Sequence, residues 1–191
     1  PAATGVELLR GYVRLRSRLF VTLSGKGLHS LTLEPAPALL AGDYLYSAAF
    51  SSLHSIPDAP SSDCFEILTT VLGTITEAFA RVYTSAEPAD YDPATFLDET
   101  AGSLGKGAAV LGATLASVDD LHRRHFARFG RGLSTVRQVD RVLEVNPKET
   151  MVVLPTVDES QLRIHAQRRQ DDVDRALDAL SKTTDVTGLR T

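Results

Sequence analysis

The sequence predicts an all-α protein, a bundle of long helices. Three observations indicate this fold class. Apolar residues recur at spacings of three and four along most of the 191 residues, and no segment alternates apolar and polar residues as a half-buried strand would. The prolines fall between the periodic segments rather than inside them. A composition of 43% hydrophobic and 23% charged residues is that of a globular domain, and we treat 1–191 as one domain.

Each predicted helix has its own boundary signals. The first carries Val6, Leu9 and Val13 near one face and ends before Gly25. Pro37 opens the second, and Ser61, Ser62 or Asp63 is expected to cap the third. The predicted helices span about 4–23, 37–54, 61–83, 93–115, 117–144 and 159–180.

Two details concern the later helices. The helix over 93–115 contains a run of small residues and is expected to kink, and Ser117 is expected to cap the helix that follows it. The stretch Met151 to Leu154 is short and β-prone, but Pro155 follows it, so we interpret it as a helix end or loop.

The helix from Pro37 to Phe50 contains one carboxylate, Asp43, in an otherwise apolar run. A carboxylate on such a face needs a partner. We therefore expect Asp43 to be at least partly buried and paired, either with an arginine or with donors at a helix end.

Composition also limits the compartment and the partners. Cys64 is the only cysteine, so neither an intrachain disulfide nor a cysteine-based metal site can form. No apolar run has the length of a membrane span, and the net charge of −4 gives no electrostatic reason to expect nucleic acid. We expect a cytoplasmic protein. The chain starts at Pro1 without an initiator Met, so we also expect the natural protein to be longer at its N-terminus.

Several segments resemble, in order, motifs of the trans-isoprenyl diphosphate (polyprenyl) synthases. Residues 37–50 (PALLAGDYLYSAAF) resemble the helix that follows the first aspartate-rich motif of that family. The other matching segments are 6–9 (VELL), 96–104 (FLDETAGSL), 129–144 (FGRGLSTVRQVDRVLE) and 176–180 (ALDAL). The resemblance implies an all-α bundle of the isoprenoid synthase type, with the N-terminal helices of the family absent from this sequence.

The resemblance also implies where catalytic residues should lie. Family members hold Mg²⁺ and a diphosphate with two D-D-x-x-D motifs, whose carboxylates share a helix face. The first motif falls at 17–21 (SRLFV), which has no acid. The second falls at 140–144, which keeps Asp140 and Glu144 as vestigial metal-ligand candidates but places Arg141 between them. The lysine that holds diphosphate in the family is Glu99 here. We therefore predict a degenerate member without catalytic residues, without a cofactor and without a magnesium–diphosphate cluster.

Two other hypotheses remain open. A divergent active prenyltransferase would need Mg²⁺ held by ligands such as Asp43, Asp140 and Glu144. An unrelated structural bundle would need neither metal nor substrate. Mg²⁺-dependent condensation of isopentenyl diphosphate with an allylic diphosphate separates the active enzyme from the degenerate member.

Arg10, Arg14 and Arg18 are spaced by four and so share a helix face. They are either an anion site, for a diphosphate or a partner's acidic surface, or a solvated face. For a chain that lacks the first helices of the family, we expect a homodimer, or a heterodimer with an active prenyl synthase, that buries more than about 1,600 Å² of largely apolar surface. An isoprenoid diphosphate is the expected ligand.

Overall fold

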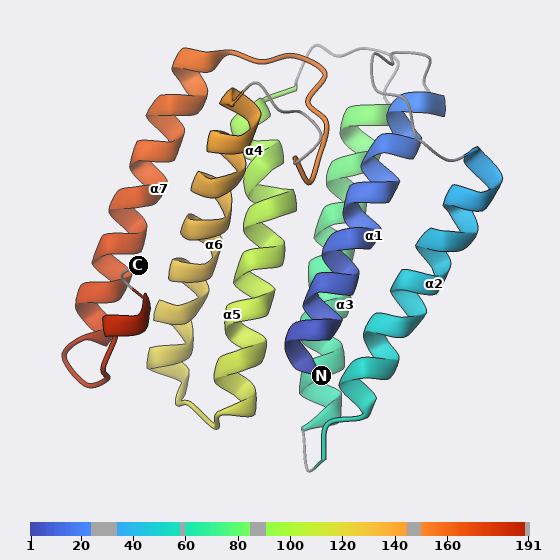
Figure 1. Ribbon diagram of the computed structural model, residues 1–191. Coiled ribbons are helices and arrows are strands. Elements are labelled where there is room, and N and C mark those ends of the chain that lie inside the picture. Colours follow the sequence, from blue (N-terminus) through green and yellow to red (C-terminus); the bar gives the residue numbers. More distant parts are fainter. Residues whose placement is uncertain (24–33, 58–59, 85–90, 145–149, 190–191) are drawn as a thin grey trace.

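The computed structural model describes residues 1–23, 34–57, 60–84, 91–144 and 150–189, and their regular structure is helical, with no strand among them (Figure 1). The all-α prediction is therefore confirmed. In chain order the helices are α1 (Ala2–Leu23), α2 (Pro35–His54), α3 (Ser61–Phe79), α4 (Pro93–Leu97), α5 (Ser103–Leu115), α6 (Asp120–Leu143) and α7 (Glu159–Leu180). Two π-helical segments, η1 (Ala80–Thr84) and η2 (Asp98–Gly102), follow α3 and α4, and a 3₁₀ turn, η4 (Thr187–Leu189), lies near the C-terminus.

Most helix termini agree with the sequence prediction, but α2 begins at Pro35 rather than at Pro37, and two caps differ. No side chain caps α3, whose N-cap residue is Pro60. Asp119 caps α6 by accepting hydrogen bonds from the backbone N–H groups of Leu121 and His122, whereas Ser117 was the expected cap. Ser117 instead adopts a left-handed conformation (φ 53°) just after α5, a conformation common directly after helix ends. The helical region 93–115, where a kink was expected, contains the π-helical η2, in which one residue is added to the helical turn.

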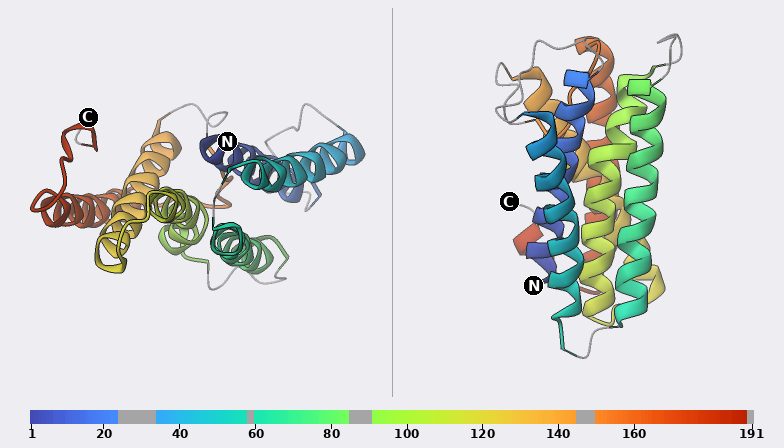
Figure 2. Two further views of the ribbon diagram at one scale, coloured as in Figure 1. Left: turned by 90° about the horizontal axis from the view of Figure 1, so that it is seen from below. Right: turned by 90° about the vertical axis from the view of Figure 1, so that its right-hand side faces the viewer.

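The long helices stand side by side, as the two further views show (Figure 2). Helix α2 forms one edge of the bundle and packs mainly on α1, and α7 forms the other edge and packs mainly on α6. Helix α5 lies between α6 and α3 and also contacts α1.

The core has two parts. The larger contains residues from all seven of the described α-helices. It includes a cluster of rings, Phe20, Phe79, Tyr83 and Phe96, whose neighbouring centroids lie 5.5–6.0 Å apart. The smaller joins α6, α7 and the residue Val186 that follows α7. None of the described helices is long and apolar enough to cross a membrane, in line with the prediction from hydropathy.

The environment of Asp43 differs from the sequence prediction. Nη2 of Arg16 donates a hydrogen bond of 2.9 Å to Oδ1 of Asp43, so the expected arginine partner is present. However, the Asp43 side chain is 65% exposed, and the expected burial is wrong. The reason lies in the packing of the helices: α2 is at the edge of the bundle and packs mainly on α1, so most of the side away from α1 stays exposed.

Candidate functional site

A cavity of about 400 Å³ lies between α1, α5 and α6. Its apolar lining comes from the facing sides of α5 and α6 and from the start of α1, through Val6, Ala101, Leu104, Ala108, Ala109, Phe129 and Leu133. Three of these residues are alanines, and next to them α5 and α6 cross closely at Gly105 and Gly130, where a Cβ atom would clash with the facing backbone. The cavity therefore has an apolar wall next to a tight helix crossing.

Three arginines, Arg10, Arg137 and Arg141, also line this cavity, together with one carboxylate, Glu7. Arg10 makes a long ion pair with Glu7 at 3.4 Å. Arg137 and Arg141 lie one turn apart on α6, and neither has an ion-pair partner among the described residues. The lining thus combines an apolar surface with an excess of positive charge, which suits an amphiphile that has an anionic head group.

Gln138 adds a polar group to the same cavity. The residue is only 3% exposed, and its Oε1 accepts a hydrogen bond of 3.2 Å from the backbone N–H of Met151. Its Nε2 is buried and has no hydrogen-bond partner, although buried donors usually have one. An acceptor on a bound ligand would satisfy this amide.

The structure separates the three arginines that the sequence grouped as an anion site. Arg10 lines the cavity, and Arg14 is exposed. Arg18 donates a hydrogen bond of 3.0 Å to the carbonyl of Thr150, and burial, followed by the charge of Arg14, lowers its pKa. Arg137 was not predicted as a site residue from the sequence. Arg141 was noted only because it stands where the resembled family has an aspartate. Their spacing of four on α6 was the available signal.

The vestigial metal candidates Asp140 and Glu144 lie at the C-terminal end of α6, and both are exposed. Asp43 lies on a different helix, α2, and pairs with Arg16. Within the described ranges, no three His, Cys, Asp or Glu side chains are close enough to hold a metal ion together.

Residues 150–153, which we call the strap, cross between the C-terminal ends of α1 and α6. Met151, Val152 and Val153 are 4%, 1% and 8% exposed, and the non-helical conformation predicted for this stretch is confirmed. Ser17 accepts a hydrogen bond of 2.8 Å from the Val153 N–H, and Arg18 and Gln138 hold Thr150 and Met151 as described above. The strap is therefore fixed to both helix ends.

Tyr83 completes this network from η1. Its hydroxyl donates a 2.7 Å hydrogen bond to the Val153 carbonyl and lies 2.9 Å from the Ser17 hydroxyl. Burial raises the pKa of Tyr83 to about 12, although its hydrogen bonds to Ser17 and Val153 act in the opposite direction. The phenol therefore stays neutral at physiological pH and serves as a donor.

Replacing Tyr83 with phenylalanine is expected to destabilise the fold by about 2 kcal/mol, because the buried Val153 carbonyl loses its donor. Urea unfolding followed by circular dichroism measures the change. Tyr12→Phe is the matched control, since the Tyr12 hydroxyl makes no hydrogen bond within the described residues and its loss should shift stability by less than about 0.5 kcal/mol. Equal effects for the two variants would show that the strap is not held by Tyr83.

Comparison with known proteins supports the fold. Neither a protein-family model nor a curated protein sequence matches the chain. Among solved structures, the chain is similar to a geranyltranstransferase from Methanosarcina mazei, with a TM-score of 0.66 and 17% sequence identity. The match covers 93% of this chain and 68% of that one. The predicted all-α bundle of the isoprenoid synthase type is confirmed as a fold.

Proposed function

We propose that this chain is a polyprenyl synthase-like protein that binds an isoprenoid diphosphate without condensing it, as a regulatory or partner subunit. The strap is the observation that carries this proposal. At the position where the resembled family has its first aspartate-rich motif, Ser17 and Arg18 are engaged in holding residues 150–153. The space next to these residues is thus filled by buried chain rather than open to a metal–diphosphate cluster.

The charges near the strap also disfavour catalysis. An allylic diphosphate needs metal ions to neutralise the leaving group as the carbon–oxygen bond breaks. Asp140 and Glu144 face solvent, and Arg141 between them would repel a cation. Glu99, at the place of the diphosphate-binding lysine of the family, is paired with Arg81.

The cavity between α1, α5 and α6 supports binding of the same class of molecule. Its apolar wall suits a prenyl tail, and Arg10, Arg137 and Arg141 can hold a diphosphate without a metal. Its volume of about 400 Å³ lies within the range typical of small-molecule sites.

Farnesyl diphosphate is the probe for this cavity. We expect saturable binding by calorimetry, unchanged by EDTA, and no product when isopentenyl diphosphate and Mg²⁺ are added. The double variant Arg137→Gln, Arg141→Gln should weaken binding at least tenfold, because each charge-assisted contact contributes roughly 1.5–3 kcal/mol. Arg124→Gln, an exposed arginine of α6 outside the cavity, is the control and should bind normally. Mg²⁺-dependent turnover would instead establish the active prenyltransferase.

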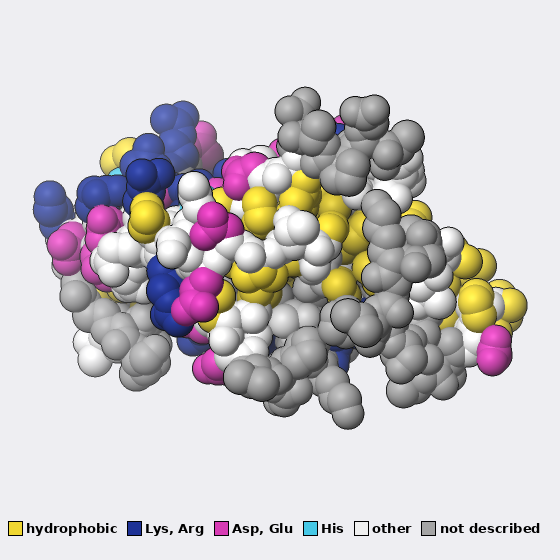
Figure 3. Space-filling model, turned by 90° about the horizontal axis from the view of Figure 1, so that it is seen from above, with side chains coloured by type: hydrophobic (Ala, Val, Ile, Leu, Met, Phe, Trp, Pro, Cys, Tyr) yellow, Lys and Arg dark blue, Asp and Glu magenta, His cyan; other side chains and the backbone are white. Residues whose placement is uncertain are grey.

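A second part of the proposal is a dimer formed through the outer face of α2. Leu40 and Tyr44 are 71% and 72% exposed there, and Leu39, Tyr46 and the neighbouring Phe65 of α3 are 39%, 40% and 37% exposed. Figure 3 shows hydrophobic side chains toward this edge, whereas Lys and Arg side chains gather on the α7 side. Asp43, the only Asp, Glu, Lys or Arg of α2, is neutralised by Arg16, so two copies of this face would not repel each other.

Light scattering at micromolar concentration is expected to give the mass of a dimer. Leu40→Glu combined with Tyr44→Glu should give a monomer, because four carboxylates would meet in the interface. Ile164→Glu, at an exposed apolar residue of α7, is the control and should leave the mass unchanged. A monomeric wild-type protein that stays monomeric when an active prenyl synthase is added would remove the dimer proposal while leaving the ligand proposal intact.

A further inference from the structure

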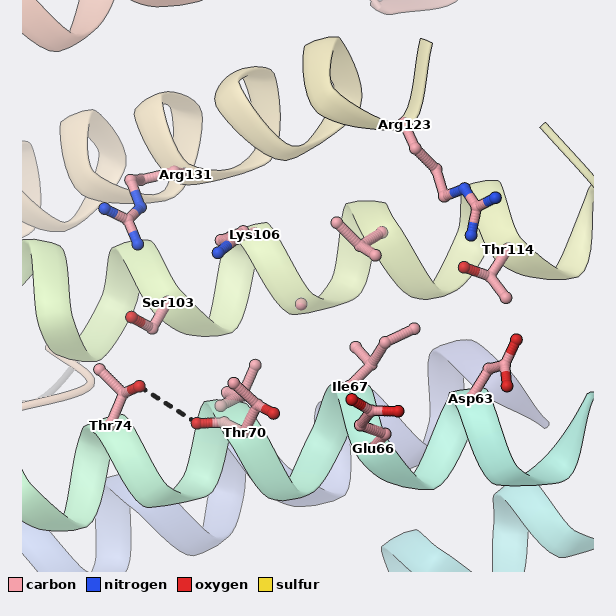
Figure 4. Close-up of a pocket in the computed structure, with 13 residues that line it drawn as sticks. Asp63, Glu66, Ile67, Thr70, Thr74, Ser103, Lys106, Thr114, Arg123 and Arg131 are labelled. Carbon is pink, nitrogen blue, oxygen red and sulfur yellow. Dashed lines mark hydrogen bonds between the residues drawn. The ribbon is translucent and has the colours of Figure 1, made fainter. Parts of the chain in front are cut away.

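A second hollow lies on the other side of α5, between α3, α5 and α6, and has a volume of about 360 Å³ (Figure 4). Its floor is closed where α3 and α5 approach so tightly that a Cβ atom on Gly107 would lie 2.5 Å from a methyl group of Val71. Its lining is more polar than that of the cavity between α1, α5 and α6: it has four hydroxyl side chains and two acids, whereas that cavity has one hydroxyl, Ser134, and one acid, Glu7. We call this second hollow the α3–α5 groove.

Opposite charges line the two walls of this groove without meeting. Asp63 and Glu66 come from α3, whereas Lys106 comes from α5 and Arg131 from α6. No ion pair involves any of these four side chains within the described part of the chain. The remaining charged residue, Arg123, is already paired with Asp120 at 2.8 Å. The groove therefore keeps two unneutralised acids and two unneutralised bases.

The charges are also separated along the groove. Figure 4 shows Asp63, Glu66 and Thr114 toward one end, together with Arg123, whose charge is paired with Asp120, and Arg131, Ser103 and Thr74 toward the other. At about 1.5 Å per helical residue, Glu66 lies roughly 6 Å from Thr70 and roughly 12 Å from Thr74 along the axis of α3. Measured along α3 from Glu66, the groove thus extends roughly 6–12 Å from its acidic end toward its basic end.

Two buried polar atoms in this groove lack a hydrogen-bond partner among the described residues, Oγ1 of Thr114 and Nε of Arg123. Thr114 is 7% exposed, and its Oγ1 has no hydrogen bond, although threonine in a helix commonly bonds to a carbonyl one turn earlier. The close-up shows the side chain at the acidic end, below Arg123 (Figure 4). An unsatisfied buried hydroxyl costs about 1–3 kcal/mol, which a polar atom of a ligand would recover.

We propose that the α3–α5 groove binds a linear zwitterion of about the length of a di- or tripeptide, with its ammonium group at Asp63 and Glu66 and its anionic group at Lys106 and Arg131. An extended chain spans about 3.3–3.6 Å per residue, so two or three residues match the separation of the charged ends. The hydroxyls of Thr114, Thr70 and Ser103 line the groove from its acidic end to its basic end, and Ile67, Val71 and Val110 supply apolar contact. This site is independent of the proposed prenyl ligand.

The test uses trialanine with free termini as the probe, measured by calorimetry or NMR titration on the full chain. We expect saturable binding that is lost when the peptide is N-acetylated and C-amidated. Glu66→Gln and Lys106→Gln should each weaken binding at least fivefold, while Glu77→Gln, an exposed acid of α3 outside the groove, should not. No saturation by about 10 mM, equal binding of the blocked peptide, or unchanged binding by Glu66→Gln would each overturn the proposal.

One further protein variant and one further ligand extend the test. Thr114→Val removes the unpaired hydroxyl at nearly constant shape, so the fold should be equally or more stable while trialanine binds more weakly. If Thr114 has only a structural role, Thr114→Val would leave trialanine binding unchanged, and this result would contradict the proposed contact of Thr114 with the ligand. 8-Aminooctanoate has the two charges but no peptide groups. Affinity equal to that of trialanine would show that the two charged ends determine recognition. Weaker affinity would show that the hydroxyl groups also form hydrogen bonds with the peptide groups.

Discussion

Replacing Gly130 with alanine is expected to destabilise the protein by roughly 3 kcal/mol, at the upper end of what overpacking costs. A Cβ atom at this position would lie 2.4 Å from the carbonyl oxygen of Gly105 and 2.6 Å from the Cβ of Ala109. The oxygen belongs to the backbone of α5 and cannot rotate away, so the two helices would have to separate. The reciprocal substitution, Gly105→Ala, meets the carbonyl oxygen of Gly130 at 2.3 Å and is expected to act in the same way.

Gly73→Ala provides a control of opposite sign. Gly73 lies in the middle of α3 and is exposed, and no atom lies within 4 Å of the position that a Cβ would take there. Alanine is favoured over glycine in a helix by about 1 kcal/mol, so this variant should be more stable than the wild type. Urea unfolding measures both variants. A stabilising effect at both positions would mean that α5 and α6 do not approach as closely as the structure shows.

The helices could be predicted because their signals are local. The prolines mark most of the boundaries, and the apolar spacing within 159–180 predicted α7 with the bounds that the structure has. The cap of α6 was missed because Ser117 and Asp119 are both good capping residues. Which of them caps depends on where α5 ends, and α5 ends through the left-handed conformation of Ser117.

The candidate site could be predicted only in part, since it depends on contacts between distant segments. The strap meets Ser17 and Tyr83 across 136 and 70 residues of sequence, and no local pattern encodes such a contact. The exposure of Asp43 likewise follows from the place of α2 at the edge of the bundle. In contrast, the absence of acids at 17–21 can be read directly from the sequence.

The π-helical segment η2 carries a buried acid, Asp98, whose side chain links η2 to α6 and α7. Asp98 is 8% exposed and accepts hydrogen bonds from Nε of Arg169 on α7, at 3.0 and 3.1 Å, and from Thr135 on α6, at 3.0 Å. Nε2 of His165 lies 3.2 Å from the same carboxylate. Burial alone would raise the pKa of Asp98, but hydrogen bonds and charges from His165 and Arg169 outweigh burial and hold the pKa below its ordinary value.

Replacing Asp98 with asparagine is expected to destabilise the fold by about 3 kcal/mol at pH 7, because Arg169 would keep a partly buried charge with its main partner removed. Since the pKa is lowered by folding, the contribution of the carboxylate is complete above the unfolded-state pKa of about 4 and is lost as the pH falls through the folded-state value. The difference between wild type and Asp98→Asn in urea unfolding should therefore shrink at pH 3. Glu159→Gln, which removes an exposed pair with Arg163, is the control and should cost at most about 0.5 kcal/mol at either pH. A difference for Asp98→Asn that is the same at pH 7 and pH 3 would show that its effect comes from packing and not from charge.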